Sequence, residues 1–254
     1  MSELPNPKEF KNFTPKVKAK DIPIIEYEYD LVSMDRNFKK AQGIELRKKA
    51  LELIDGKLWS LSPEVFKKYI GYSTKYSSLT VSLYDEHNQV QAICIREAKD
   101  KSGNPIKWKT YGSKRFTPYR IFDKDNPLLF IGFGIGEFLL FELLQMNYIA
   151  FQSDSIAKSM SKDKAPTIDK DFVLMVLLDN DKSCKETIKP LKELYDNLLI
   201  EVNFEYLLDR GLPKGYDFRD FCNEIALESH SNGLRDDILE YLSNEIRFNY
   251  PDGI

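Results

Sequence analysis

The chain has 254 residues, of which 42% are hydrophobic and 13% aromatic, so it can bury a substantial core and is not globally disordered. The formal net charge of −3 gives no bulk electrostatic reason to expect nucleic acid. The three cysteines, Cys94, Cys184 and Cys222, are far apart and show no CxxC spacing, which speaks against a disulfide framework and a zinc knuckle.

The beginning of the sequence, MSELPNPKEFKNF, lacks an apolar signal region, and no apolar run is long enough to span a bilayer. We therefore expect a cytoplasmic protein that does not enter a membrane. Residues 1–24 are polar and rich in proline and lysine, which predicts an extended arm.

Residues 25–125 are expected to form a smaller α+β subdomain. Residues 35–54 contain good helix formers with apolar residues on one face. Ser62 followed by Pro63 predicts the start of another helix, with Gly71 at its end. Residues 79–84 and 90–95 alternate between apolar and polar side chains, which predicts a β-hairpin. Residues 96–120 are expected to be irregular and basic.

From about residue 126 to residue 228 the pattern is typical of an α/β unit with a mostly parallel sheet flanked by helices. Short apolar runs predict strands and longer segments predict helices between them. The expected strands are 128–131, 149–151, 172–178 and 199–204, and the expected helices are 137–146, 184–198 (with Pro190 as a break in its first turn), part of 212–228, and a terminal helix at 234–248 within 229–254.

Asp179 and Asp181 follow the most apolar of these runs. In an open parallel sheet, ligands bind beyond the carboxyl ends of the strands. Two carboxylates two residues apart at such an edge would attract a hard divalent cation, because Mg²⁺ prefers oxygen ligands. The alternative is that the segment is a turn or a helix N-cap, since Asp and Asn favour both.

The glycine-rich segment 131–137, IGFGIGE, raises the question of a dinucleotide-binding turn. Its glycines follow G-x-G-x-G, not G-x-G-x-x-G, and Asp154, the nearest acid about 20 residues later, lies in a polar stretch. A tight strand-to-helix turn that needs glycine for its backbone angles explains the segment equally well.

Two further regions carry candidate site residues. Segment 212–220 contains Pro213, Gly215 and Asp217, so Asp217 is a candidate third metal carboxylate or the N-cap of the following helix. Segment 96–120 has eight Lys and Arg residues against two acids, with aromatic residues between them. Such a stretch suits single-stranded nucleic acid, whose phosphates need cations and whose bases stack on rings. The alternative is a solvated loop with its aromatic side chains turned to the core.

Taken together, these elements and acids resemble the Toprim fold of DnaG-type bacterial and phage primases over about residues 61–228. In that family a strand leads into a Glu-Gly-x-x-Asp turn. The similar segment here is 133–137, FGIGE, in which Phe133 stands in place of the leading glutamate and Glu137 in place of the aspartate. Asp179 and Asp181 match the family's DxD motif.

Segment 213–217, PKGYD, resembles the phage-like Pro-Lys-Gly-x-Asp loop. Asp220 lies near the family's last acid, and Arg219 stands at a position that is often acidic. The hairpin at 79–96, which ends in an arginine, and the residues around Trp108 and Lys114 resemble the segment that precedes the Toprim unit in primases.

The resemblance implies RNA primer synthesis on single-stranded DNA from nucleoside triphosphates, with Mg²⁺ or Mn²⁺ as cofactor and a replicative helicase or another replication protein as a candidate partner. The implied catalytic residues are Glu137, Asp179 and Asp181, and the implied metal ligands are Asp179, Asp181, Asp217 and Asp220. The candidate nucleic-acid-binding residues are Arg96, Lys107, Trp108, Lys109, Lys114 and Arg115.

Phe133 bears on activity, because phenylalanine can neither transfer a proton nor bind a metal ion as glutamate does. Two alternatives therefore stand beside primer synthesis. The first is a catalytically silent Toprim module that binds nucleic acid or acts as a scaffold in replication or mobile-element maintenance. The second is a Toprim nuclease.

Overall fold

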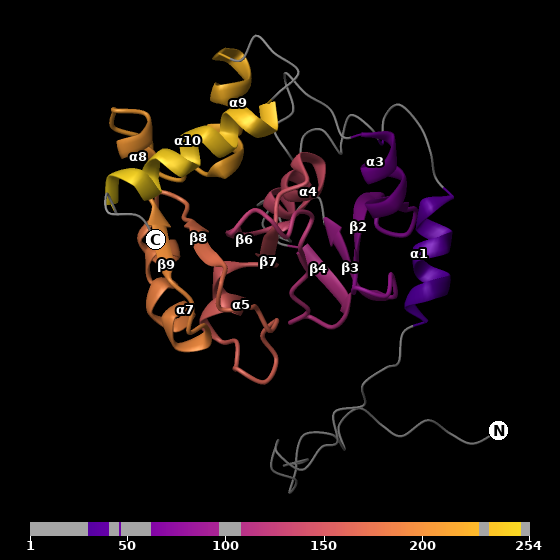
Figure 1. Cartoon of the computed structure of the whole chain (residues 1–254). Coiled ribbons are helices and arrows are strands. Elements are labelled where there is room, and N and C mark those ends of the chain that lie inside the picture. The colour runs from indigo at the N-terminus through magenta and orange to yellow at the C-terminus, as the bar shows by residue number, and fades with distance from the viewer. Residues whose placement is uncertain (1–29, 41–45, 47–61, 97–107, 229–233, 250–254) are drawn as a thin grey trace, which may run out of the picture.

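The computed structural model describes residues 30–40, 46, 62–96, 108–228 and 234–249. Within these residues the strands form one four-stranded and one five-stranded sheet, and helices flank both (Figure 1). The predicted fold class is confirmed: the protein is mixed α/β, with a largely parallel sheet that follows a smaller α+β region. The predicted arm at residues 1–24 lies outside the described residues.

The first sheet is antiparallel with the order β1-β2-β3-β4. Its strands are β1 (Ile70–Ser73), β2 (Ser78–Tyr84), β3 (Val90–Arg96) and β4 (Trp108–Gly112), accompanied by α1 (Leu31–Lys39) and α3 (Pro63–Tyr69). The predicted hairpin is confirmed as β2 and β3. The predicted start of α3 is also confirmed, because Ser62 Oγ accepts a hydrogen bond of 3.2 Å from the Val65 amide.

Two expectations for this region are wrong, and a third lies partly outside the described residues. Gly71 does not end a helix, because α3 stops at Tyr69 and Gly71 lies within β1, where a Cβ would come 2.7 Å from Thr80 Oγ1. Segment 96–120 is not irregular throughout, because it contains β4, which pairs with the edge of β3 that β2 does not occupy. Of the helix expected at 35–54, the part up to Lys39 lies in α1, and most of the remainder lies outside the described residues.

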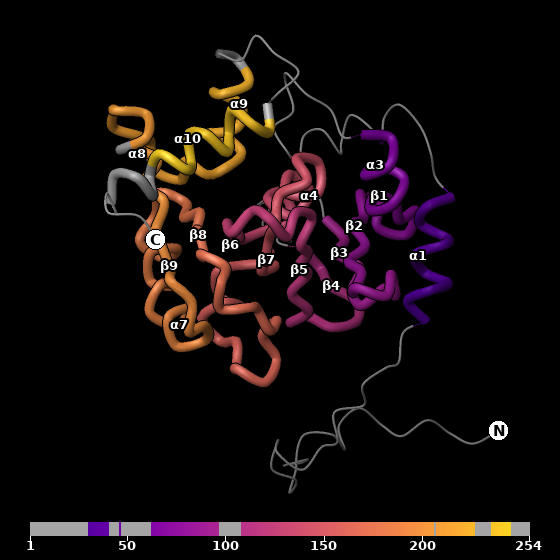
Figure 2. The backbone as a smooth tube through the Cα atoms, in the orientation of Figure 1, coloured from indigo at the N-terminus to yellow at the C-terminus, as the bar shows by residue number. Residues whose placement is uncertain are grey.

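The second sheet has the order β5-β7-β6-β8-β9 (Figure 2). Its strands are β5 (Tyr119–Arg120), β6 (Leu128–Phe133), β7 (Tyr148–Phe151), β8 (Val173–Leu177) and β9 (Leu199–Val202). The last four run parallel to one another, and β5 is antiparallel to β7. Because β5 precedes residue 125, this sheet begins before the proposed domain boundary.

Helices cover both faces of this sheet, which explains the continuous apolar character of its strands. One face packs against α4 (Ile135–Leu144), α9 (Phe218–Glu228) and α10 (Leu234–Asn249) through a core that also includes one face of the first sheet. The other face packs against α5 (Asp154–Lys158), α6 (Lys182–Lys185) and α7 (Ile188–Leu194). Figure 1 shows α8 (Phe204–Leu207), α9 and α10 together at one side of the sheet and α5 and α7 at the other.

The strands and the long helices predicted for this half are confirmed within a few residues. The single helix expected at 184–198 is instead α6 followed by α7, and Pro190 lies in the first turn of α7, where its missing amide hydrogen costs no helical bond. Helices α5 and α8 were not predicted, because four or five residues carry too little periodicity. None of the described helices is both long enough and apolar enough to cross a membrane.

Candidate active site

Three acidic side chains at the carboxyl edge of the second sheet interact electrostatically. Asp179 follows β8, Glu137 lies in the first turn of α4 after β6, and Asp217 precedes α9. The electrostatic field of Asp217 acts on both of the other carboxylates. Asp217 thus lies within electrostatic range of Asp179, although the two residues are 38 positions apart in the chain.

Asn180 holds the loop that carries Asp217 against the end of β8. Its backbone amide donates to Tyr216 O at 2.8 Å, and its carbonyl accepts from the Gly215 amide at 3.1 Å. Its side-chain Nδ2 donates to Leu212 O at 3.2 Å. The positive φ of 81° at Gly215 allows the chain to turn there. The residue between the two aspartates thus determines where Asp217 lies.

The glycine-rich turn gives Glu137 room to fold back over the end of β6. A Cβ on Gly134 would overlap Glu137 Oε2, and the φ of 134° at Gly134 is itself accessible to glycine alone. A Cβ on Gly132 would lie 3.2 Å from Glu137 Cβ. The turn is therefore a cradle for a carboxylate, which favours the tight-turn interpretation over a dinucleotide-binding one.

Arg219 forms ion pairs with two of the three acids. Its Nε lies 3.1 Å from Glu137 Oε1 and 2.9 Å from Asp217 Oδ2, and its terminal nitrogen makes a second ion pair with Asp217. Both carboxylates are buried, with 7% of each side chain exposed. Sequence reasoning noted Arg219 as a departure from an acidic position but did not place it among the acids.

Burial and neighbouring charges hold protons on this edge. Burial, then the negative charges of Asp217 and Asp181, raise the pKa of Asp179 to about 7. Burial also raises the pKa of Glu137, and the Arg219 guanidinium opposes that shift. Asp179 therefore changes charge near neutral pH.

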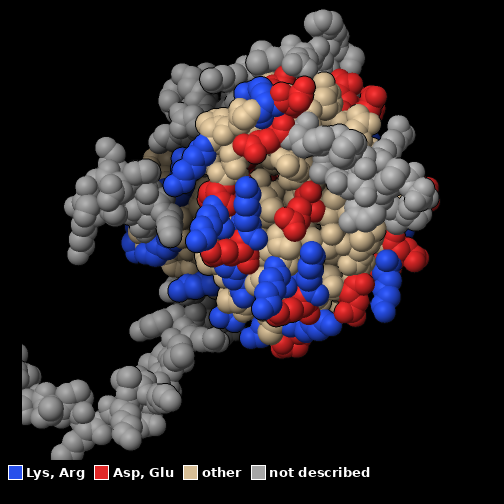
Figure 3. Space-filling view, turned by 90° about the vertical axis from the view of Figure 1, so that its left-hand side faces the viewer, with Lys and Arg blue, Asp and Glu red and all other residues tan. Residues whose placement is uncertain are grey.

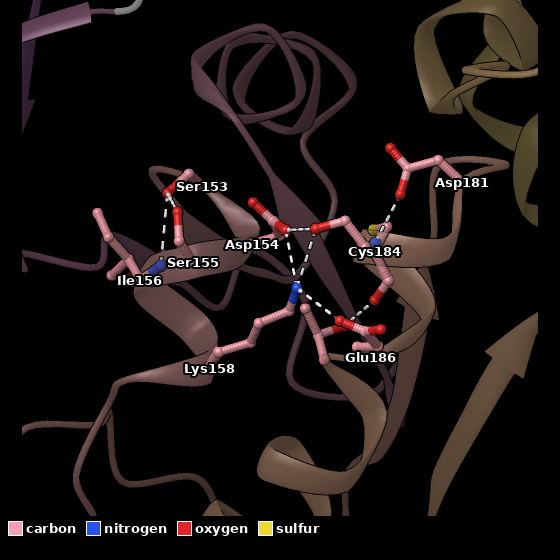
Figure 4. Close-up of polar contacts among 10 residues, drawn as sticks. Ser153, Asp154, Ser155, Ile156, Lys158, Asp181, Cys184 and Glu186 are labelled. Carbon is pink, nitrogen blue, oxygen red and sulfur yellow. Dashed lines mark hydrogen bonds and ion pairs between the residues drawn. The ribbon is translucent and has the colours of Figure 1, made fainter.

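Asp181 and Asp217, both predicted site residues, also cap helices. Asp181 Oδ1 accepts a 2.6 Å hydrogen bond from the Cys184 amide at the start of α6 (Figure 4). At the start of α9, Asp217 Oδ1 accepts from the Asp220 amide at 3.1 Å while Asp220 Oδ2 accepts from the Asp217 amide at 3.2 Å. This reciprocal pair is a capping box with aspartates in both positions. The N-cap interpretations of Asp181 and Asp217 are therefore confirmed.

These contacts limit how a metal ion could be held. In the part of the chain that the structure describes, no three or more His, Cys, Asp or Glu side chains form a group that could hold one. Mg²⁺, however, keeps several waters and is usually held by one or two carboxylates together with substrate phosphates. Asp179 and Asp181, which interact electrostatically, fit that requirement as a pair.

Asp154 is a further acid of this edge, which sequence reasoning did not assign to the metal site. It follows β7, and its charge raises the pKa of Asp179. Its carboxylate accepts hydrogen bonds from Ser183 Oγ at 2.6 Å and from Lys158 Nζ at 3.1 Å. Figure 4 shows Lys158 reaching toward Asp154. Burial works against ionisation of Asp154, but these hydrogen bonds outweigh it and lower its pKa. The signal available in the sequence was Ser153-Asp154-Ser155 directly after a strand.

Phe133 does not point toward the three acids. It is 7% exposed and belongs to the apolar layer under α5, α6 and α7. Its ring is stacked on Phe151, with a centroid distance of 6.1 Å and an interplanar angle of 17°. The residue that the resemblance aligns with the leading glutamate is thus a core residue.

Gln152 links this edge to the basic segment. At the end of β7, its Oε1 accepts from Thr110 Oγ1 of β4 at 3.2 Å, and its Nε2 donates to Phe116 O at 2.8 Å. Exposed Lys114 and Arg115 immediately precede Phe116. They therefore belong to the segment that is fastened to the carboxyl edge.

The remaining basic candidates are divided between the two faces of the first sheet, because successive side chains of a strand point to opposite faces. Arg96 and Trp108 are paired and share the face of Thr110, although Trp108 packs partly into the core. Lys109 lies on the other face, where its Nζ donates to Tyr76 OH at 3.2 Å and lies 4.8 Å from the centre of the Tyr76 ring. Lys107 lies outside the described residues.

The surface beyond β9 and α7 does not continue the basic segment. Figure 3 shows Lys and Arg side chains interleaved with Asp and Glu side chains over this face. Lys162 and Asp196, for example, form an exposed ion pair at 3.2 Å. This face offers no field of a single sign to a polyanion.

A scan against protein-family models finds no match to this chain, and no curated protein matches its sequence. Solved structures do match. The zinc-binding and RNA polymerase domains of the Aquifex aeolicus primase match with a TM-score of 0.56 and 13% identity, over 84% of this chain and 60% of that one. The chain therefore spans about three fifths of that structure.

Two other primase structures are similar at lower scores. The DnaG primase catalytic domain bound to single-stranded DNA has a TM-score of 0.48 with 11% identity, over 87% of this chain and 84% of that one. The primase fragment of the bacteriophage T7 primase-helicase protein has a TM-score of 0.46 with 17% identity, over 71% of this chain and 69% of that one. At these identities the Aquifex likeness shows the fold: this chain has a primase-like core fold.

Proposed function

We propose that this chain is a primase-like Toprim protein that binds single-stranded DNA and nucleoside triphosphates and joins nucleotides into RNA primers. The observation that carries the proposal is the convergence of Asp179, Asp217 and Glu137 at the carboxyl edge of a sheet in a primase-like fold. That edge is where open α/β sheets bind ligands.

In this proposal Asp179 and Asp181 hold Mg²⁺ or Mn²⁺. A divalent cation there would stabilise negative charge on the phosphate oxygens of a nucleotide. Asp217 and Asp220 fix the start of α9 beside this pair through their mutual hydrogen bonds. Glu137 keeps Arg219 in position through its ion pair. In this proposal Asp217, Asp220 and Glu137, which the sequence indicated for metal binding or catalysis, instead position the start of α9 and the side chain of Arg219.

The single strand would follow the segment that Gln152 fastens to the acidic edge. Lys114 and Arg115 supply exposed cations there, and Arg96 lies on the same face of the first sheet as Thr110, which Gln152 contacts. Lys109 would contact a more distant part of the strand, beside the rings of Tyr76 and Tyr111. Trp108 supports the segment through its packing on the core.

The test is to incubate the protein with single-stranded DNA, nucleoside triphosphates and Mn²⁺ and to resolve the products on a denaturing gel. New oligomers are expected from the wild type and none from Asp179→Asn. A matched control is Asp171→Asn, because Asp171 is an exposed acid before β8, at the opposite end of the same strand. Equal synthesis by Asp179→Asn and the wild type would refute the role of this edge, and shortened DNA would identify a nuclease.

A second candidate function is nucleic-acid binding or scaffolding without catalysis. It is favoured by the guanidinium of Arg219 within the acidic edge and by the burial of Phe133 away from it. In the same assay this function gives salt-sensitive binding of DNA with neither synthesis nor cleavage.

A further inference from the structure

The guanidinium of Arg219 occupies the place that a cation would take between Glu137 and Asp217. The two carboxylates approach it from different elements, α4 and the start of α9, and its Nε lies within 3.1 Å of an oxygen of each. An acid is common at this position in the family that the sequence resembles. The arginine therefore places a positive charge at a position where the resemblance leads one to expect a negative one.

Both carboxylates are held facing the guanidinium, so neither can readily turn toward a cation elsewhere. Glu137 folds over Gly134, and its carboxylate is enclosed by the turn after β6. Asp217 Oδ1 accepts hydrogen bonds from the amides of Arg219, at 2.8 Å, and Asp220 at the start of α9. The guanidinium contacts the other oxygen, Asp217 Oδ2, so a metal ion between the two carboxylates would have to displace the guanidinium.

The guanidinium also keeps its positive charge between the two carboxylates at every ordinary pH. Arginine does not lose its proton in proteins, so no ordinary pH change empties the position. Its planar fork makes two contacts with Asp217 and one with Glu137, whereas 30% of the side chain remains exposed. The exposed part leaves a route by which solvent ions reach the two carboxylates once the guanidinium is removed.

We propose that Arg219 is an internal counter-cation that prevents Glu137 and Asp217 from binding a divalent ion. The carboxylates on either side of it then contribute no metal ligand in the wild type. Metal binding falls to the pair of Asp179 and Asp181 alone, and this last part rests on the proposed function. The part that concerns Arg219 stands by itself and predicts a latent metal site.

The test is a titration of the purified chain with Mn²⁺ alone, without DNA or nucleotides, in which free Mn²⁺ is measured by electron paramagnetic resonance. Arg219→Gln is expected to bind an additional Mn²⁺ ion, at least tenfold tighter than any ion at this position in the wild type. Arg219→Lys retains a positive charge and is expected to behave as the wild type. Adding Glu137→Gln to Arg219→Gln should remove the gain, because the new site loses a ligand.

Arg210→Gln is the matched control. Arg210 lies before α9 and forms an exposed ion pair with Glu224 of α9, the helix that also carries Arg219, so its loss should leave Mn²⁺ binding unchanged. If Arg219→Gln fails to unfold cooperatively, Glu137→Gln in the wild-type background decides, because a nonligand can be neutralised without loss of Mn²⁺ affinity. Unchanged binding by Arg219→Gln, or a tenfold loss by Glu137→Gln alone, would overturn the proposal. A wild type that binds no Mn²⁺ would instead count against Asp179 and Asp181, while the gain in Arg219→Gln could still be measured.

Discussion

Replacing Phe133 by glutamate restores the residue that the resemblance predicts, and we expect it to destabilise the protein. Phe133 is 7% exposed, and its ring is stacked on Phe151 in the layer under α5 to α7. A glutamate at this position would place its carboxyl group among apolar side chains. The substitution would restore the residue expected from the resemblance, but at a position that lies in the apolar core of this protein.

The magnitude follows from the area that the ring buries. An aromatic side chain buries about 150–250 Å², and at about 25 cal/mol per Å² the lower figure corresponds to about 4 kcal/mol. A compact denatured state reduces this to about 3 kcal/mol for Phe133→Ala, which agrees with the range of about 3–5 kcal/mol for such truncations. Burying even a neutral carboxyl group adds about 1–3 kcal/mol, so Phe133→Glu should cost about 4–6 kcal/mol.

The assay is urea unfolding monitored by circular dichroism, with Phe133→Leu as the control that conserves apolar character and should cost about 1 kcal/mol. The loss in Phe133→Glu should grow as pH rises, because the buried carboxyl has a raised pKa in the folded state and the unfolded state gives up its proton first. A cost below 1 kcal/mol for Phe133→Glu would refute the reasoning, since it would mean that residue 133 reaches the solvent-facing edge.

Three more predictions address stability, pH and nucleic acid. Asn147→Ala should lower the free energy of unfolding by about 3 kcal/mol in urea melts, because the buried amide donates to Asp123 O at 2.7 Å and accepts from the Phe122 amide at 2.8 Å, and both groups lose their partner. In EDTA the free energy of unfolding of the wild type should fall as pH rises from about 4 to about 7, because folded Asp179, whose pKa is raised to about 7, keeps a proton that the unfolded chain has released. The fall is up to about 1.4 kcal/mol per pH unit and should be smaller in Asp179→Asn. Equal slopes of unfolding free energy against pH in the two proteins would contradict this prediction. Lys114→Ala should weaken single-stranded DNA binding and reduce the slope of log affinity against log salt by roughly 0.7, whereas Lys124→Ala, an exposed lysine at the other end of the second sheet, should not.

The elements that the sequence predicted well are those whose side-chain period is set by burial. The three central strands of the second sheet, β6, β7 and β8, are buried on both faces, so their apolar runs mark them clearly. The turn after β8 was also predictable, because two aspartates after such a run can only lie at the edge of the sheet. Serine followed by proline fixed the start of α3 for a local reason that needs no partner.

What the sequence could not show depends on residues that are distant in the chain. Strand β4 forms because β3 offers a free edge, and a short polar strand carries little period of its own. The division of Arg96 and Lys109 between two faces follows from the register of that pairing. The capping of α6 by Asp181 was foreseen as an alternative, but only the structure decides which hydrogen bond a carboxylate makes.

The two departures of this chain from the primase pattern act in the same direction. Compared with the pattern that the sequence resembles, Phe133 stands where a glutamate is expected and Arg219 stands where an acid is common, so both make this part of the chain less negative. Each change is accommodated in its own way, because Phe133 joins an apolar layer and Arg219 forms ion pairs with Glu137 and Asp217. An edge that had merely lost its function would not need a guanidinium placed between two buried carboxylates. If Arg219 acts as the proposed counter-cation, the edge binds fewer divalent ions than the pattern that the sequence resembles, and the number of bound Mn²⁺ ions is the property that tests this difference.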